Sequence, residues 1–140
     1  MAKVNFKGLE KFTEKINKLN QAEINKFNEA AIKELAQRLL RKAFLRTPVG
    51  QYDKKTGKKG GTLRRGWTIG EVTKTDTEYT VQVINPVEYA SYVEFGHRTP
   101  NHKGWVDGRF MLTISEQEIE KDAPRILENK LNNFLNEIFR

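Results

Sequence analysis

The two histidines of the chain lie close together in a glycine-rich segment, and a metal site is the first chemistry that they suggest. His97 and His102 are five positions apart, and Glu94 or Asp107 could join them as a third ligand. A structural zinc site takes four ligands, and a catalytic one usually takes three in fixed geometry. Because the sequence has neither an HExxH motif nor any cysteine, it does not supply such a set. We therefore expect no metal ion and no other cofactor.

Motifs for nucleophilic and phosphate chemistry are absent as well. The sequence contains no GxSxG elbow and no GxxxxGK[ST] loop. Residues 57–62 resemble a phosphate-binding loop in composition only, because no strand and helix flank them to aim backbone amides at an anion. A nuclease would need acidic residues or histidines clustered to hold a metal, and no such cluster is evident. The sequence therefore predicts that the protein is not an enzyme.

Positive charge is concentrated in one part of the chain, which has a formal net charge of +7 and an isoelectric point near 9.6. Residues 51–61 are predicted to form a flexible basic loop, and residues 51–66 carry six basic side chains against Asp53 alone: Lys54, Lys55, Lys58, Lys59, Arg64 and Arg65. Such a run could neutralise several phosphates. The aromatic residues are not interleaved as a base-stacking platform requires. A basic DNA-binding accessory protein is therefore the alternative function.

Helical periodicity dominates both ends of the sequence. Apolar residues at three- and four-residue spacing predict helices over residues 8–19 and 22–46, the second with a stripe that includes Ala31 and Ala43. The second helix should end at Thr47-Pro48, because a residue before proline avoids the helical region. A final helix is expected after Leu112 and out to the C-terminus, kinked or divided at Pro124.

Shorter periods and turn residues occupy the middle of the chain. Alternation around a polar turn at 74–78 predicts a β-hairpin within 63–85. Residues 87–96 could form a helical turn or a strand, and 96–110 should form a second irregular loop in which Trp105 and Val106 could make a short strand. The fold class is therefore α+β in one domain over residues 1–140, a small antiparallel β-sheet packed against a long helix in the N-terminal half and a long C-terminal helix, with two glycine-rich loops. We expect no membrane span, since no apolar run reaches eighteen residues, and no secretory signal.

Four blocks of the sequence carry a resemblance to a known family: TPV at 47–49, LRRGW at 63–67, VEYASYVEFGHRT at 87–99 and GRFML at 108–112. They are similar to the minor tail-component family of lambdoid and related siphophages. Members of that family carry TPVDTG-LRRSW, YAxYVEFGT and GRxFL-like signatures between two helices. The resemblance covers about residues 25–135. It departs from the pattern where the short DTG link is replaced by the lysine-rich segment that follows TPV.

The resemblance implies a structural protein of the virion rather than a catalyst. It implies a subunit of the neck or tail-completion complex, which forms a ring, expected to be hexameric, and joins the tail to the head around the DNA channel. The other partners would be neck and tail proteins such as the connector and the tail terminator, and the ring could contact DNA without sequence preference. The protein would be assembled in the cytoplasm of a bacterial host. No membrane is implied.

The residues expected to carry this role fall into two groups. Those expected at subunit interfaces and in the loops are Lys54, Lys55, Lys58, Lys59, Arg64, Arg65, Tyr92, Glu94, His97, Arg98 and Trp105. Those expected to hold the sheet and the loop bases are Leu63, Trp67, Tyr89, Phe95, Gly96, Gly108, Phe110 and Met111. The pairs Glu94–Arg98 and Arg64–Glu88 could set loop conformations through charge-assisted hydrogen bonds. The basic loop and the acidic C-terminal helix are candidates for the two different surfaces that a ring requires.

Overall fold

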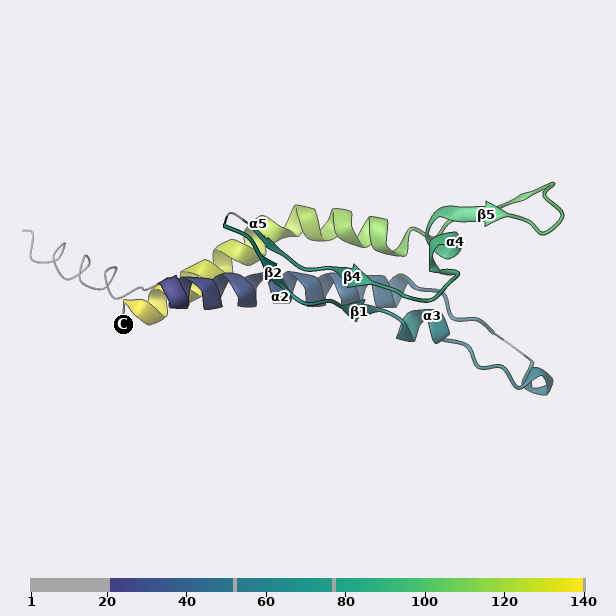
Figure 1. Ribbon diagram of the computed structural model, residues 1–140, viewed down its shortest axis with the longest axis horizontal. Helices are drawn as coiled ribbons and strands as arrows, with labels where there is room; N and C mark the ends of the chain where they lie inside the picture. The colour runs from purple at the N-terminus through teal and green to yellow at the C-terminus, as the bar shows by residue number, and fades with distance from the viewer. Residues whose placement is uncertain (1–20, 52, 77, 140) are drawn as a thin grey trace, which may run out of the picture.

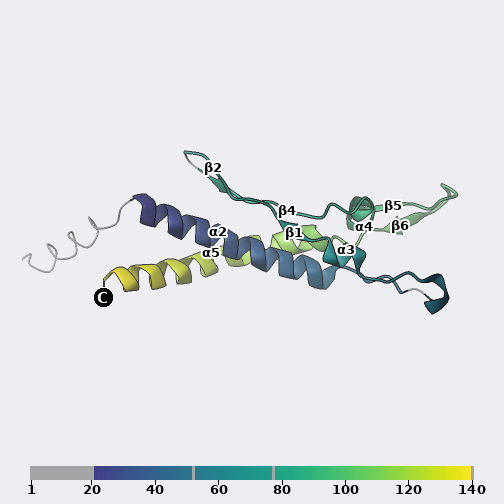
Figure 2. The same cartoon turned by 60° about the horizontal axis from the view of Figure 1, so that its bottom comes forward.

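Two long helices form the body of the protein. The computed structural model describes residues 21–51, 53–76 and 78–139, and the helix predicted over 8–19 lies outside this part of the chain. Helix α2 spans Gln21–Arg46 and helix α5 spans Met111–Ile138. The two helices pack along each other and define the long axis of the molecule (Figures 1 and 2). Shorter elements lie between them in sequence and cover one side of the pair.

The end of helix α2 agrees with the sequence prediction. The helix ends at Arg46, and the next residue, Thr47, caps it: its hydroxyl donates to the carbonyl of Ala43 at 2.6 Å. The buried positions of the helix are all alanines, at 31, 36 and 43. Ala31 and Ala43 belong to the predicted stripe, but Ala36 does not. Small side chains at these positions allow neighbouring elements to approach the helix axis closely.

Helix α5 continues through its proline. Pro124 lies near the middle of this helix of 28 residues, which is not divided, although its axis bends (Figure 1). A proline inside a helix removes one backbone hydrogen bond and tends to kink the helix, which the prediction anticipated. The buried residues of the helix, Met111, Ser115, Ile119 and Ile126, recur at helical spacing and form one inward face.

The predicted hairpin between the helices is present, in two parts. Strands β1 (Thr68–Ile69) and β4 (Val83–Ile84) pair antiparallel, and so do β2 (Thr73–Lys74) and β3 (Tyr79–Thr80). Three residues separate β1 from β2, but only two separate β3 from β4. One strand of the hairpin therefore carries an extra residue, which interrupts the ladder as a β-bulge does.

The segment predicted as a second irregular loop is instead a second hairpin. Strand β5 (Gly96–Arg98) pairs antiparallel with β6 (Trp105–Asp107), which includes the predicted short strand. The turn closes through Thr99, whose amide donates to the carbonyl of Gly104 at 3.0 Å and whose hydroxyl accepts from the Gly104 amide at 3.0 Å. The prediction missed this strand pairing because the three glycines of the segment favoured an irregular loop.

Three short helices complete the structure. Residues 87–96, for which helix and strand both remained open, form helix α4 (Ala90–Phe95). Helix α3 (Thr62–Arg65) and the 3-10 helix η1 (Lys54–Thr56) were not predicted. The fold class is α+β, as predicted, with three two-stranded antiparallel ladders in place of one sheet. Among the described helices, none is both long enough and apolar enough to cross a membrane.

The lysine-rich loop and the β5–β6 hairpin extend from the same end of the molecule. Both project beyond the end of α2 and the start of α5, away from the C-terminus (Figures 1 and 2). Their bases lie close to the blocks of sequence that carry the family resemblance. This end is therefore where a functional site has to be sought.

A charged cluster joins the two long helices near this end. The carboxylate of Glu118 pairs with Lys42 at 2.7 Å and with Arg46. Arg46 also donates to the hydroxyl of Ser115 at 3.0 Å, and Ser115 donates to the carbonyl of Met111 at 2.5 Å. The hydrogen bond from Arg46, followed by that from Lys42, lowers the pKa of Glu118 from 4.5 to about 2.

This cluster predicts a pH dependence of stability. Because the folded pKa of Glu118 lies below its unfolded value, its ion pairs stabilise the fold above about pH 4.5, and the contribution is lost as the pH falls toward 2. We expect Glu118→Gln to lower the free energy of unfolding at pH 7 and to flatten its decline between pH 4.5 and 2. Urea denaturation at several pH values measures both effects. Glu120→Gln, at an exposed position on the same helix, is the matched control, and equal slopes for the two variants would contradict the prediction.

Candidate functional site

The end of helix α2 is tied to helix α3 and strand β1 by side chains of the TPV and LRRGW blocks. Thr47 is fully buried, and its hydroxyl accepts a hydrogen bond of 2.6 Å from the indole nitrogen of Trp67. Its carbonyl accepts from Nη2 and Nε of Arg64 at 2.7 and 3.2 Å. The Arg64 guanidinium also lies over the ring of Phe44, 5.1 Å from its centroid. These contacts satisfy the last polar groups of α2 with side chains from the next element.

A second set of contacts closes the base of the first hairpin. Asn85 donates from Nδ2 to the carbonyl of Leu63 at 2.7 Å and accepts at Oδ1 from the amide of Val87 at 3.2 Å. A Cβ atom on Gly66 would collide with Oδ1 of Asn85 and lie 2.8 Å from Cγ2 of Val87, so glycine is needed for close packing there. Asn85 was not among the residues predicted to have a role. Asparagine after a strand and before proline was the signal for this bracing role.

Glu94 holds the start of helix α5. Its side chain is buried, with 7% of the residue exposed. One carboxylate oxygen accepts from the amide of Leu112 at 2.9 Å, and the other accepts from the amide and the hydroxyl of Thr113 at 2.8 and 2.7 Å. Phe110 precedes the helix with a positive φ of 48° and has no side-chain cap of its own. A negative side chain at a helix N-terminus is favourable, so Glu94 supplies from α4 the cap that α5 lacks.

Backbone segments on both sides of the β5–β6 hairpin pass very close to each other. The amides of Arg109 and Phe110 donate to the carbonyls of Val93 and Glu94 at 2.7 and 3.0 Å. Gly96 has a φ of 88°, and a Cβ atom there would lie 2.5 Å from the carbonyl oxygen of Val106. A Cβ atom on Gly108 would collide with the carbonyl oxygen of Glu94. Both glycines are therefore required by close backbone approach, as their predicted place in the motif suggested.

The chain matches the family model described as "Bacteriophage HK97-gp10, putative tail-component" over residues 10–96, which is more than half of its length. The chain belongs to this family. The protein is therefore a structural component of a bacteriophage tail, and a tail component is a part of the virion. The match includes α2 and the two tied blocks, and it ends at the glycine that begins β5. Searches of the curated proteins and of the solved structures gave no significant match.

More of the aromatic rings of the tail component are exposed than the sequence predicted. Leu63 and Met111 are buried, and Trp67 is half-buried. Tyr89, Phe95 and Phe110 were expected to hold the sheet and the loop bases, but all three are exposed. Together with Tyr92 and Trp105, they form an exposed set that we call the aromatic lobe, residues 89–110.

The charged candidates also divide into two kinds. Lys54, Lys55, Lys58, Lys59 and Arg65 are exposed on the projecting loop or at its base. Arg64 and Glu94 were expected at interfaces, but both are engaged inside the protein with Thr47 and with helix α5. The expected Glu94–Arg98 and Arg64–Glu88 pairs are not formed. We therefore assign Arg64 and Glu94 a positioning role.

The two histidines do not meet a third ligand. The imidazole of His97 lies 5.6 Å from the ring of Tyr92, and its Nδ1 is buried without a hydrogen bond. His102 is exposed in the hairpin turn with a φ of 57°. Within residues 21–51, 53–76 and 78–139, no group of three metal-ligating side chains is found. Nothing in their geometry gives the two histidines a joint role.

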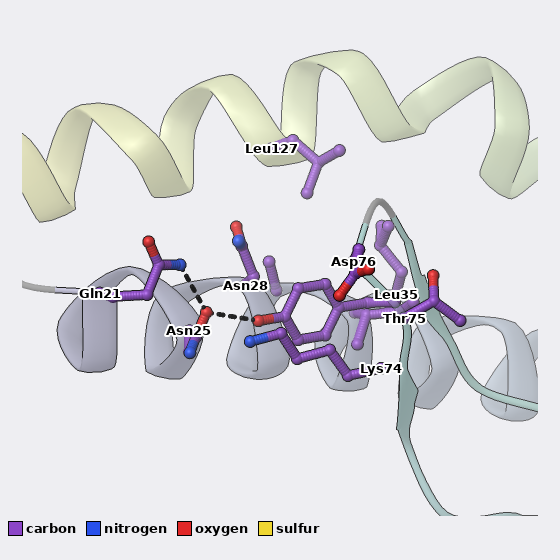
Figure 3. A pocket seen from close by; sticks show the side chains of 11 residues that line it. Gln21, Asn25, Asn28, Leu35, Lys74, Thr75, Asp76 and Leu127 are labelled. Carbon is purple, nitrogen blue, oxygen red and sulfur yellow. Dashed lines mark hydrogen bonds between the residues drawn. The ribbon is translucent and has the colours of Figure 1, made fainter.

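A hollow lies at the opposite end of the first hairpin, and the side chains that line it anchor the hairpin. It has a volume of about 450 Å³ and lies between helix α2, the β2–β3 turn and Leu127 of α5 (Figure 3). Oδ1 of Asn25 accepts from Gln21 and from the Tyr79 hydroxyl, both at 2.9 Å. These polar groups satisfy one another and hold the turn on α2. The hollow therefore has a structural explanation.

The Glu94 cap can be tested by a conservative substitution. In Glu94→Gln an amide group would face backbone amides of α5 that need an acceptor, so we expect a loss of about 1–3 kcal/mol in the free energy of unfolding. Chemical denaturation followed by circular dichroism measures it. Glu88→Gln is the control, because Glu88 is exposed and lies just before helix α4, which carries Glu94. A loss no greater than that of the control would show that the cap contributes nothing.

Proposed function

We propose that this tail component is a subunit of the neck or tail-completion complex, where copies form a ring that joins the tail to the head connector around the DNA channel. Membership in the tail-component family gives the structural role. The observation that supports assembly into a ring is the aromatic lobe. Tyr92, Phe95 and Trp105 have 59%, 62% and 58% of their surface exposed.

Such exposure has a physical cost that assembly would remove. A soluble monomer seldom exposes several large aromatic rings in one patch, and patches of this kind mark protein–protein contacts. Phe95 and Phe110 lie edge to face, with ring centroids 6.4 Å apart, so these two of the exposed rings contact each other. Aromatic residues and arginine are enriched in the centres of interfaces, and this lobe carries both.

The basic loop is the second feature that fits a ring. Lys54, Lys55 and Lys59 are exposed, and within the described part of the chain they form no ion pair. The loop leaves the body beside the aromatic lobe (Figure 1). In a ring, this charge would face either the acidic part of a neighbouring copy or the phosphates of DNA in the channel. Such charges guide association more than they strengthen it.

The proposal predicts a defined oligomer and a defined place in the particle. We expect the purified protein to form a single closed species by multi-angle light scattering, and its tagged copy to appear at the head-proximal end of the tail by electron microscopy. A monomer at all concentrations that never enters particles would contradict the ring. A label along the whole tail, or at its far end, would contradict the neck position while leaving the tail component in place.

The exposed lysines also favour a second candidate, a basic DNA-binding accessory protein. If the protein binds DNA through phosphates, its binding constant should fall steeply as salt is added. The slope of the logarithm of the binding constant against the logarithm of the salt concentration should be roughly −1 for each phosphate neutralised. We expect replacement of Lys54, Lys55 and Lys59 by glutamine to reduce this slope, measured by fluorescence anisotropy with duplex DNA, and to leave the oligomer intact. Replacement of Lys26, Lys33 and Lys121, which are exposed on the long helices, is the control. If the protein remains a monomer in solution and this monomer binds DNA strongly, the DNA-binding candidate is favoured over the ring.

A further inference from the structure

The β5–β6 hairpin presents an aromatic ring and a cation on one face. Its register places Arg98 opposite Trp105 and Gly96 opposite Asp107, with His97 and Val106 between them. Residues opposite each other in an antiparallel pair share a face, and alternate pairs return to the same face. Arg98 and Trp105 therefore point the same way, on the face that also holds Gly96 and Asp107.

Trp105 is held in place although it is exposed. A Cβ atom on Gly96 would lie 2.9 Å from Cζ2 of the Trp105 indole, so the indole covers the bare backbone of this glycine. The contact orders the ring before any partner arrives, which lowers the entropy that binding would cost. An isolated two-stranded hairpin is only marginally stable in water. The hairpin thus resembles a preformed binding element more than a part of the core.

A groove that complements this element begins at Phe95 of helix α4, next to the base of the hairpin. It has a volume of about 440 Å³ and is lined by side chains of β4, α4 and α5. Ile84, with 45% of its surface exposed, and Leu112 give it an apolar wall, and Glu116 stands at its edge. Glu120 follows one helical turn later and is also exposed. The groove therefore offers apolar surface next to negative charge. The hairpin offers the Trp105 ring next to the positive charge of Arg98, with Asp107 two residues beyond the ring.

We propose that Trp105 and Arg98 of one copy dock into the Ile84–Leu112–Glu116 groove of the next copy. This inference rests on the proposed ring, for which it names the contact. The occupant of the groove is a second copy because a projecting hairpin and a groove are two different surfaces of one chain, and Arg98 and Glu116 carry opposite charges, which is what a head-to-tail contact needs. Trp105 supplies contact area, and the Arg98–Glu116 pair fixes the direction of docking. Tryptophan and arginine are the residues that most often dominate the energy of an interface.

The contact predicts a charge swap between copies. Arg98→Glu and Glu116→Arg should each raise the dissociation constant of the oligomer about tenfold or more, because each replaces an attraction by a repulsion. Mixing the two variants should restore assembly, since each then meets its complementary charge, and so should the double variant in one chain. Trp105→Ala should raise the dissociation constant of the oligomer about 30-fold, whichever charge position 116 carries. Sedimentation velocity measures all four proteins, with circular dichroism to verify that each is folded.

Matched controls separate this contact from a general effect of charge. Lys103→Glu changes a cation in the turn of the same hairpin, and Glu128→Arg reverses an exposed acid farther along α5. Both should assemble normally.

If the wild-type protein forms an oligomer that neither Arg98→Glu nor Glu116→Arg weakens, or if mixing fails to restore it, the proposed contact is wrong while the ring stands. If the wild-type protein is a monomer, the ring itself fails. If these variants assemble normally but no longer join other tail proteins, the hairpin binds a different protein, which also overturns the contact.

Discussion

The carboxylate of Glu94 at the start of helix α5 is the interaction on which the other arrangements depend. It satisfies the amides of Leu112 and Thr113, which have no acceptor within their own helix. Because β5 begins two residues after Glu94, the same contact fixes where the second hairpin leaves the body. A carboxylate in this place joins α4, α5 and the hairpin in one rigid unit. The backbone that carries the aromatic lobe is therefore positioned by a buried side chain whose hydrogen bonds are satisfied.

At the end of helix α2, as at the start of α5, polar side chains from a neighbouring element satisfy the groups at the helix terminus. Thr47 ends α2 and binds both Trp67 and Arg64, so the first hairpin starts in a fixed direction. Across the gap between the two long helices, Glu118 pairs with Lys42 and Arg46. Polar contacts thus position elements that a small apolar core would leave loosely connected. Each of them is costly to break on one side only, because the remaining partner is left without its hydrogen bond.

The sequence predicted the elements better than it predicted the roles of their side chains. Helix α2, its end at Thr47, the first hairpin and the fold class follow from periodicity and turn residues, which are local signals. The second hairpin was missed because the glycines of residues 96–110 favoured a loop, whereas its strands pair residues up to eleven positions apart. Glu94 and Arg64 were placed at interfaces because charge usually means exposure. Only the three-dimensional structure shows which backbone groups lack partners and so bring these side chains inside.

The balance between buried and exposed apolar surface connects folding with assembly. Among the described residues, seven hydrophobic side chains are buried, and three of them are alanines, whereas fourteen large hydrophobic side chains are exposed. A core of this size contributes little beyond the entropy that it must offset. Burying even a few of the exposed rings against a neighbour would add stability by mass action, since the neighbour binds only the folded chain. Burial of these rings in the proposed ring would therefore stabilise the folded subunit, and an aromatic lobe on a rigid base is suited to such a contact.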